Sequence, residues 1–242
     1  MRIDIFLTEK GFVKSRSKAK EYIDSGRVTV NGITVKKAGQ EVTGDEDIRL
    51  ANPDKFVSRA GQKLESALDI FGIDVTGLDA LDLGASTGGF TDCLLQRGAK
   101  RVIALDVGRD QLDASLRRDE RVFVMESTNA RDIEARDLPF APQIVTTDLS
   151  FISQALVYPA VARVLKKGYF ISLIKPQFEA GKENIGKGGI VKDKDGKIFS
   201  EILKKLTLAA EQNGLILKKT VLSPILGGDG NTEYLALFER SV

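Results

Sequence analysis

Single charged residues close several mainly apolar runs in this chain of 242 residues. The runs IALD, IVTTD and SLIK end at Asp106, Asp148 and Lys175. Burying a charge is costly unless the charge is paired or used, so ionisable side chains at such positions are candidates for a site. A purely structural Asp–Lys pair is the alternative, and the pattern alone leaves both interpretations open.

A glycine-rich turn, LDLGASTGGFTDCLL, lies between an apolar run and a helical pattern. Such a turn is compatible with NAD, FAD, another nucleotide, S-adenosylmethionine or a structural role. Its glycine spacing is not G-x-G-x-x-G, so the dinucleotide fingerprint is absent. Asp82 would repel a pyrophosphate but tolerate a sulfonium or ammonium group, and Asp106 is placed to accept hydrogen bonds from both ribose hydroxyls. These features favour S-adenosylmethionine, and we expect it to contact Asp82, Gly84, Ser86, Thr87, Gly88, Gly89, Phe90 and Asp106.

The composition limits the chemistry that is available. One cysteine and no histidine exclude a disulfide framework and any Ser-His or Cys-His nucleophile, and they argue against a zinc site, so we expect no metal. Proton transfer must then come from Lys, Asp, Glu or Tyr. The net charge of +2 identifies no partner. The first residues lack the apolar block of a signal peptide and no run approaches the roughly 20 apolar residues of a membrane span, so we expect a cytoplasmic protein.

Beyond residue 58 the hydrophobic periods alternate between strand and helix. A helix carrying Leu64, Leu68 and either Ile70 or Phe71 precedes the expected strands. These strands are at 80–84, 102–107, 122–126, 144–148, 170–175, 216–222 and 234–238. Helical patterns separate most of them, which predicts an α/β, doubly wound, Rossmann-like sheet whose ligands lie beyond the carboxyl ends of its strands.

The first fifty residues follow a different plan, that of a small α+β domain. Ser15 is placed to cap a helix that stops at Gly26. Asn31-Gly32, between two alternating segments, predicts a hairpin. We therefore expect a small domain at 1–50, a linker at 51–58 and a larger domain at 59–242.

Basic residues crowd the expected helix of the small domain. Residues 10–37 hold eight basic and two acidic side chains, which leaves six positive charges. Lys14 and Lys18, like Arg16 and Lys20, are spaced i,i+4, so like charges stack on the helix surface. A phosphate backbone would relieve that repulsion, whereas a solvated basic face is the alternative. We expect RNA to contact Arg16, Lys18, Lys20 and Arg27.

Several of these segments resemble known families. SRSKAKEYIDSGRVTVNG resembles the S4 RNA-binding domain, over about residues 1–50. DLGASTGGFTDCLL, ALDV, TTDLSFIS, LIKPQFEAGKE and GGDGNTEYLALF resemble the FtsJ-type methyltransferase domain, although Thr87 replaces a proline of FtsJ in the glycine loop. Together they look like the TlyA family of S4–FtsJ proteins, often named hemolysins. The resemblance implies S-adenosylmethionine-dependent 2′-O-methylation of cytidines in ribosomal RNA, with ribosomal RNA or ribosomal subunits as partners and no membrane.

The same resemblance implies a catalytic tetrad of Lys63, Asp148, Lys175 and Glu233. A ribose hydroxyl is a poor nucleophile while it is protonated, so the reaction needs a base. We assign Lys175 to take that proton or orient the hydroxyl, with Lys63 assisting. Asp148 and Glu233 would position the lysines and balance their charge, and much of the acceleration would come from positioning.

Other functions have less support in the sequence. Amino methylation of a base usually goes with Asn-Pro-Pro-Tyr or Asp-Pro-Pro-Tyr where this chain has TDLSF, and carbon-5 methylation needs a nucleophile where Cys93 is expected in a core. GKENIGKGG at 181–189 imitates a P-loop, but Gly188 replaces the Ser or Thr that holds magnesium, so we interpret it as a mobile basic loop over the substrate. Phe151 and Phe178 are candidates for stacking on a base or for the core. A membrane-active hemolysin and a non-catalytic RNA-binding assembly factor stay open as alternatives, although no apolar span or basic amphipathic helix supports the former.

Overall fold

The computed structural model describes residues 1–51, 54–193 and 195–241. The chain forms two compact units, Met1–Asp54 and Lys55–Val242. Within the described ranges, no helix is both long and apolar enough to cross a membrane.

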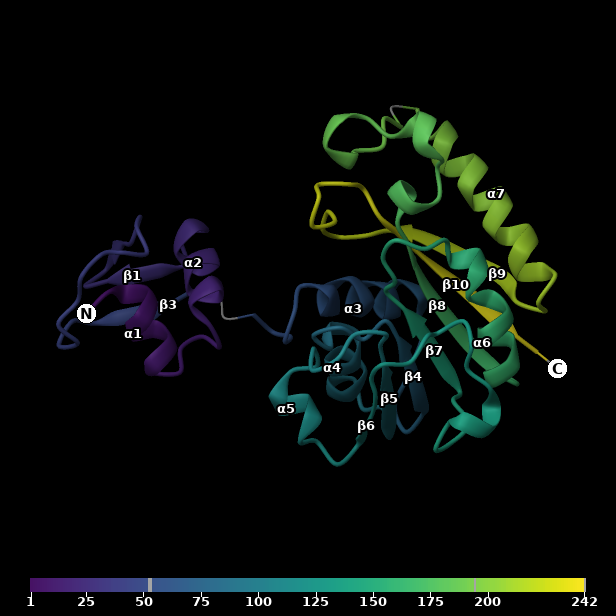
Figure 1. Cartoon of the computed structure of the whole chain (residues 1–242), viewed down its shortest axis with the longest axis horizontal. Coiled ribbons are helices and arrows are strands. Elements are labelled where there is room, and N and C mark those ends of the chain that lie inside the picture. Colours follow the sequence, from purple (N-terminus) through teal and green to yellow (C-terminus); the bar gives the residue numbers. More distant parts are fainter. Residues whose placement is uncertain (52–53, 194, 242) are drawn as a thin grey trace. The chain divides into compact units, whose positions relative to one another are not determined.

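The first unit packs two helices against a small antiparallel sheet (Figure 1). Ser15 caps α2 by accepting a hydrogen bond from the Lys18 amide, as predicted. Asn31 and Gly32 have φ values of 50° and 79°, the left-handed conformations of a type I′ turn, so the predicted hairpin is confirmed. The elements are α1 (Ile3–Glu9), α2 (Arg16–Asp24), β1 (Val28–Val30), β2 (Ile33–Thr34) and β3 (Ile48–Leu50), and the sheet order is β2-β1-β3.

The second unit is built on a seven-stranded sheet. Each of the seven predicted strands is present, with bounds that differ by at most two residues at either end. The strands are β4 (Asp79–Leu83), β5 (Arg101–Leu105), β6 (Val122–Met125), β7 (Ile144–Thr147), β8 (Gly168–Ile174), β9 (Ile216–Leu222) and β10 (Tyr234–Arg240). Their order is β6-β5-β4-β7-β8-β10-β9, in which β10 pairs antiparallel with β8 and with β9. The doubly wound sheet is therefore confirmed.

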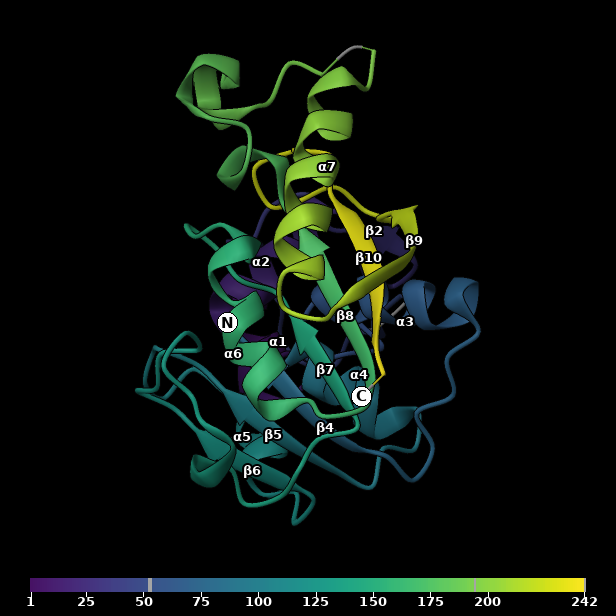
Figure 2. The ribbon, with the colours of Figure 1, turned by 90° about the vertical axis from the view of Figure 1, so that its right-hand side faces the viewer.

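Helices cover both faces of this sheet (Figure 2). Side chains alternate along β8, so Phe170 and Ile174 pack on one face while Ile171 and Leu173 pack on the other. The first face is covered by α6 (Tyr158–Val164) and α7 (Lys197–Glu211), and the second by α3 (Ala60–Phe71), α4 (Gly89–Gln96) and α5 (Ala114–Arg117). Short 3₁₀ helices lie at Ala135–Asp137, Gln154–Leu156, Pro176–Phe178, Lys182–Asn184 and Lys187–Gly189.

Helix α3 meets the sheet through Leu64 and Leu68, which are buried as predicted. Of the two candidates for the next apolar position, Phe71 packs against the core whereas Ile70 is 47% exposed. The residues before α3 also pack. Phe56 is buried, and the Val57 amide donates to Asp92 on α4 at 2.8 Å.

The segment expected as a linker, 51–58, is divided between the units. Residues 52 and 53 lie outside the described residues. Asp54 belongs to the first unit, where Lys18 and Arg27 pair with its carboxylate and its amide donates to the Tyr22 hydroxyl. Lys55 begins the second unit, and its carbonyl oxygen accepts a hydrogen bond from Gln96.

Candidate active site

The strand order reverses between β4 and β7, which run parallel as neighbours although they are far apart in sequence. Ligands of doubly wound sheets bind in the crevice at the carboxyl ends of such strands. Gly84 follows β4 with φ of 83°, and a Cβ atom at that position would lie 2.9 Å from the carbonyl oxygen of Asp148. The glycine therefore allows the turn after β4 to approach the end of β7 without a clash.

Asp106, directly after β5, holds the glycine turn in place. Its carboxylate accepts hydrogen bonds from the amides of Ser86 at 2.8 Å and Gly108 at 2.7 Å. Ser86 has φ of 47°, an uncommon conformation for a residue other than glycine. The hydrogen bond from its amide to Asp106 therefore helps to offset the free-energy cost of this backbone conformation.

Glu126, after β6, is a residue that the sequence interpretation missed. Its carboxylate accepts hydrogen bonds from the amides of Asp110, Gln111 and Leu112 and pairs with Arg117. The Arg117 contact and the backbone donors lower the pKa of Glu126 to about 2. Through these hydrogen bonds Glu126 orders residues 110–112, in the segment after Asp106. An acid at the end of a strand was its only signal in the sequence.

Two cavities meet at this switch point. The larger, of about 560 Å³, includes Asp106, Leu105, Ala130 and Phe151 in its lining. The smaller, of about 260 Å³, is lined by the glycine turn, by Ser58 and Ala60 at the start of α3, and by Lys175. Both are lined by Gly84, Ser86, Asp148 and Ser150, so they adjoin each other. Of the predicted cofactor residues, Gly84, Ser86, Thr87, Gly89, Phe90 and Asp106 line one or both cavities.

Asp82 and Gly88 are not in the lining of either cavity. Asp82 is fully buried and accepts hydrogen bonds from the Thr91 hydroxyl at 2.7 Å and the Thr146 hydroxyl at 3.0 Å. Burial raises the pKa of Asp82 to about 7, against the effect of these hydrogen bonds. The expected contact of Asp82 with a cationic ligand therefore has no support here, because even-numbered positions of β4 face α4. Asp82 instead ties β4 to α4 and β7.

The four residues of the predicted tetrad form two ion pairs. Lys63 on α3 contacts Glu233 at 2.5 Å, and both side chains are more than nine-tenths buried. Lys175 contacts Asp148 at 2.6 Å and also donates to the Ser150 hydroxyl at 2.9 Å. The Lys175 and Asp148 side chains are 11% and 19% exposed.

Sheet register brings these pairs to one edge. Ile174 pairs with Tyr234 in the β8–β10 ladder, so Lys175 and Glu233 are the next residues at the carboxyl end of β8. A third cavity, of about 210 Å³, is lined by Lys63 and shares Ser58 and Ala60 with the 260 Å³ cavity. The cavity lined by Lys63 therefore adjoins the cavity lined by Lys175 and Asp148.

The sequence matches the FtsJ-like methyltransferase family over residues 56–240. The chain belongs to this family. Residues 1–48 of the methyltransferase match the S4 domain family. The methyltransferase is 40% identical over 236 residues to the 16S/23S rRNA (cytidine-2′-O)-methyltransferase TlyA of Mycobacterium tuberculosis, covering 96% of this chain and 87% of that protein. It is 42% identical over 242 residues to Hemolysin A of Brachyspira hyodysenteriae, with 98% and 99% coverage.

Solved structures share the fold of this chain. A proposed hemolysin of Streptococcus thermophilus superposes with a TM-score of 0.79 at 41% identity, covering all of this methyltransferase and 88% of that chain. Fibrillarin of Aeropyrum pernix with bound S-adenosyl-L-methionine superposes with a TM-score of 0.53 at 19% identity, covering 83% and 84% of the two chains. At that identity the likeness shows a shared fold.

Two aromatic side chains lie in the segments that carry Asp148 and Lys175 of the methyltransferase. Phe151 is 91% exposed with φ of 64°, and its ring centroid lies 5.1 Å from that of Phe178. Phe151 is therefore not a core residue, which was one of its two expected roles. Cys93 is buried on α4, and burial raises the pKa of its thiol to about 12, so it is core and unsuited to act as a nucleophile.

The segment that imitates a P-loop packs against the segment that carries Glu233. Asn231 is 2% exposed; its side chain accepts from the Val191 amide and donates to the Gly189 carbonyl oxygen, both at 2.9 Å. Strand β8 ends at Ile174, well before Gly181, so no strand leads directly into the segment. That this segment is a mobile basic loop over the substrate stays a prediction. Its last residue, Gly189, is held by the buried side-chain amide of Asn231.

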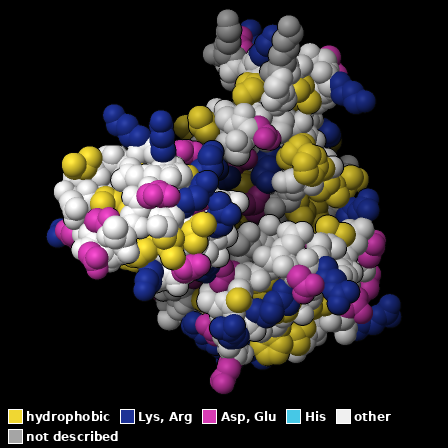
Figure 3. Space-filling view, turned by 60° about the vertical axis from the view of Figure 1, so that its left-hand side comes forward, with side chains coloured by type: hydrophobic (Ala, Val, Ile, Leu, Met, Phe, Trp, Pro, Cys, Tyr) yellow, Lys and Arg dark blue, Asp and Glu magenta, His cyan; other side chains and the backbone are white. Residues whose placement is uncertain are grey.

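The basic side chains expected to bind RNA have acidic partners within the first unit. Arg16 pairs with Asp4 at 2.9 Å and Lys20 pairs with Asp24 at 3.1 Å. Lys18 and Arg27 both pair with Asp54, at 2.7 and 2.9 Å. On the face seen in Figure 3, Lys and Arg side chains likewise lie among Asp and Glu side chains. Like-charge repulsion is therefore weaker than the spacing suggested. The Arg16 and Lys20 side chains remain 59% and 67% exposed, whereas those of Lys18 and Arg27 are 26% and 23% exposed.

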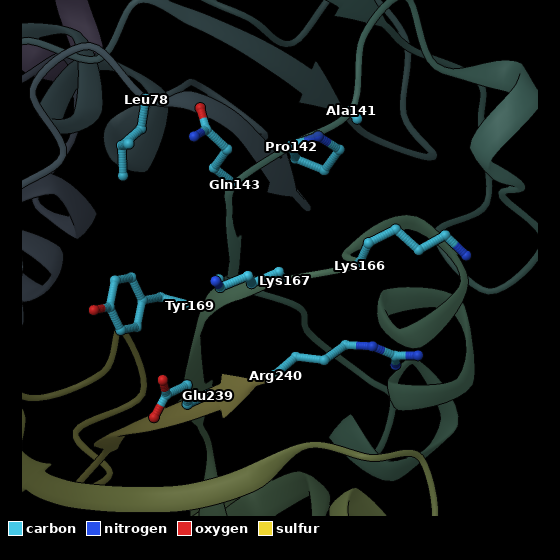
Figure 4. A pocket seen from close by; sticks show the side chains of 10 residues that line it. Leu78, Ala141, Pro142, Gln143, Lys166, Lys167, Tyr169, Glu239 and Arg240 are labelled. Atoms are coloured by element: carbon cyan, nitrogen blue, oxygen red, sulfur yellow. The ribbon is translucent and has the colours of Figure 1, made fainter. Parts of the chain in front are cut away.

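A cavity of about 550 Å³ lies at the opposite, amino edge of the sheet. Lys166, Lys167 and Arg240 line it, but their charged ends do not converge on one point (Figure 4). Glu239 in the same lining pairs with Lys218 at 2.9 Å. None of the predicted site residues is in this lining, so the candidate active site is the carboxyl edge.

Glu233→Ala should destabilise the methyltransferase strongly, because it leaves the Lys63 ammonium buried without a partner. We expect the free energy of unfolding, measured with urea, to fall by about 3–5 kcal/mol. Lys63→Met combined with Glu233→Leu should recover most of that stability. Lys197→Ala, which breaks the exposed pair with Asp195, is the control and should change stability little. Equal small decreases in all variants would contradict a structural role for the buried pair.

Proposed function

We propose that this protein transfers a methyl group from S-adenosylmethionine to the 2′-oxygen of cytidine ribose in ribosomal RNA. The observation that carries the proposal is the Lys175–Asp148 pair, which lies where the two switch-point cavities adjoin. Relatives named rRNA (cytidine-2′-O)-methyltransferases, 36% and 40% identical to this chain, support the acceptor. A ribosomal subunit is the proposed form of the substrate, and that substrate would place the protein in the cytoplasm.

The cavity residues fit S-adenosylmethionine. Each Asp106 oxygen accepts one backbone hydrogen bond and keeps a lone pair for a ribose hydroxyl. Leu105 and Ala130 give apolar surface beside it. A side chain at Gly84 would clash with Leu149 and the Asp148 carbonyl oxygen, so glycine keeps the turn close to the segment after β7. When bound, the cofactor supplies a methyl group activated by a positively charged sulfur. The residues proposed to hold it are Gly84, Ser86, Thr87, Gly89, Phe90 and Asp106.

Lys175 is the proposed base. In its neutral form the Nζ atom has a lone pair that can accept the proton of a 2′-hydroxyl. Asp148, at 2.6 Å, then stabilises the ammonium that forms. The Ser150 hydroxyl, at 2.9 Å, limits the directions in which Nζ can point. Lys63, held by Glu233, adds positive charge beside the developing negative charge on the ribose oxygen.

The acceptor base and the RNA backbone have separate candidate contacts. We propose that the exposed ring of Phe151 stacks on the target base, since base stacking on aromatic side chains is a common mode of RNA recognition. In the first unit we propose Arg16 and Lys20 as phosphate contacts. Lys18 and Arg27 would act partly by holding Asp54.

Lys175→Ala should abolish most methyl transfer while leaving cofactor and RNA binding intact. We expect the single-turnover rate constant, measured with labelled S-adenosylmethionine and ribosomal subunits, to fall by roughly 10²–10⁴-fold. Lys175→Arg should not restore it, because guanidinium remains protonated. Mapping the labelled nucleotides in the wild-type reaction tests the acceptor. RNA binding without methylation by the wild type would indicate an assembly factor instead.

Asp106→Ala should weaken S-adenosylmethionine binding by roughly 1.5–3 kcal/mol, the range for hydrogen bonds to a charged group. Titration calorimetry on the folded variant measures this. The decrease combines the ribose hydrogen bonds with the release of the Ser86 amide. Asp113→Ala, which removes an acid that caps α5, is a control expected to bind normally. Wild-type affinity in Asp106→Ala would contradict the proposed cofactor position.

Arg16→Ala combined with Lys20→Ala should weaken RNA binding and flatten its salt dependence. Removing one phosphate-binding side chain should lower the slope of log affinity against log salt by about 0.7–0.9. Affinity for S-adenosylmethionine should stay at the wild-type value. A wild-type salt slope would show that these side chains form only a solvated basic face.

A further inference from the structure

A buried carboxylate, Glu179, lies beneath the candidate active site and has no role in the proposed reaction. It follows the 3₁₀ turn after β8 and is 8% exposed. One carboxylate oxygen accepts a hydrogen bond from the Ser153 hydroxyl and the other from the Gln154 amide, both at 2.7 Å. Ser153 and Gln154 belong to the segment after β7, so Glu179 joins the segments that follow two adjacent strands.

Gln154 extends this connection into the sheet. Its side chain is 2% exposed, accepts from the Thr147 hydroxyl at 2.9 Å and donates to the Leu173 carbonyl oxygen at 3.1 Å. Thr147 directly precedes Asp148, and Leu173 lies two residues before Lys175. Glu179 and Gln154 therefore connect β7 and β8 just below the Lys175–Asp148 pair.

Segments 148–153 and 175–179 also meet on the solvent side. There, Lys175 contacts Asp148 and Ser150, and Phe178 packs against Phe151. Phe151 has φ of 64°, which costs energy for a bulky side chain and persists only where the surroundings fix it. Local conformational preference does not maintain this shape, so contacts of the segment with its surroundings must maintain it.

The surroundings of Glu179 suit a supporting role. It is not in the lining of the cavities that contain Asp148 and Lys175, so direct contact with a cofactor there is not indicated. Its two hydrogen-bond donors are neutral, and among the described residues no Lys or Arg forms a salt bridge with it, although the positive charge of Lys205 acts to lower its pKa. Burial raises the pKa of Glu179, so keeping a carboxylate here has a cost that a space-filling apolar side chain would avoid.

We propose that Glu179 is a positioning residue for methyl transfer: by binding Ser153 and Gln154 it fixes segment 148–153, and so holds Asp148 and Ser150 against Lys175. The inference rests on the proposed function for its kinetic consequence. Its structural consequence, the order of segment 148–153, stands independently of the reaction.

Glu179→Gln tests the proposal with little change of shape. An amide has one acceptor oxygen and one NH2 donor, so it cannot accept from both the Ser153 hydroxyl and the Gln154 amide in the present geometry; one of the two hydrogen bonds is lost or reverses its direction. We expect the single-turnover rate at saturating cofactor and RNA to fall by about 10–100-fold, since small misplacements of reacting groups have effects of this size. Affinities for S-adenosylmethionine and RNA should match the wild type. Ser153→Ala removes one of the two hydrogen bonds from the other side and should also lower the rate. Glu211→Gln, exposed on α7, is the matched control and should not change the rate.

Hydrogen–deuterium exchange on the same variants gives a readout that needs no activity. Peptides covering 148–155 should exchange faster in Glu179→Gln and Ser153→Ala, while those of β4 and α4 should exchange as in the wild type. Wild-type exchange in 148–155, or a wild-type rate in Glu179→Gln, would overturn the proposal. Faster exchange throughout the second unit would also overturn it, because it would indicate general destabilisation. A wild type that methylates no ribose, with the local change in exchange present, would reject the proposed function and keep only the structural role of Glu179 in ordering segment 148–153.

Discussion

The need to pair buried charges organises the carboxyl edge of the large sheet. Lys63 and Glu233 are almost fully buried, and their 2.5 Å contact joins α3 to the residue before β10. Removing either partner would leave an uncompensated charge in an apolar setting, which is far more costly than breaking an exposed pair. Helix α3, the β8–β10 ladder and the catalytic edge are therefore mechanically linked through one ion pair.

The second pair, Lys175 with Asp148, differs in its exposure and in its surroundings. It adjoins two cavities, and its residues belong to segments that follow different strands. The close approach of Gly84 to Asp148 places the glycine turn beside the same pair. The Lys63–Glu233 pair is the more deeply buried and supports the fold, although Lys63 lines a small cavity, while the Lys175–Asp148 pair faces the space where a substrate can enter. The same residue types serve both purposes because their exposure differs, and exposure decides which pair a ligand can reach.

Hydrogen bonds from backbone amides give the site its remaining shape. Asp106 holds Ser86, Glu126 holds the segment after β5, and Glu179 holds Gln154. Each is a carboxylate that follows a strand and accepts amides from a neighbouring segment. Irregular segments at a functional edge lack the hydrogen bonds of a helix or sheet, so side-chain acceptors must satisfy their amides. The FtsJ-like site is accordingly rich in acids that shape the backbone around it.

The sequence by itself determined the seven strands, the S4 helix cap and hairpin, and which charged residues stand at strand ends. These features follow from local periodicity and turn chemistry, to which neighbouring residues contribute most. Only the tertiary structure decided which partner each charged side chain contacts. Asp82 turned inward to Thr91 and Thr146 because strand alternation points it at α4. Lys18 and Arg27 form ion pairs with Asp54, and Glu179 accepts a hydrogen bond from Ser153. These partners are about 26–36 residues apart in the chain, so no local pattern encodes the contacts. A polar side chain's role depends on which partner the fold brings within hydrogen-bonding distance, and that is set by packing rather than by spacing in the chain.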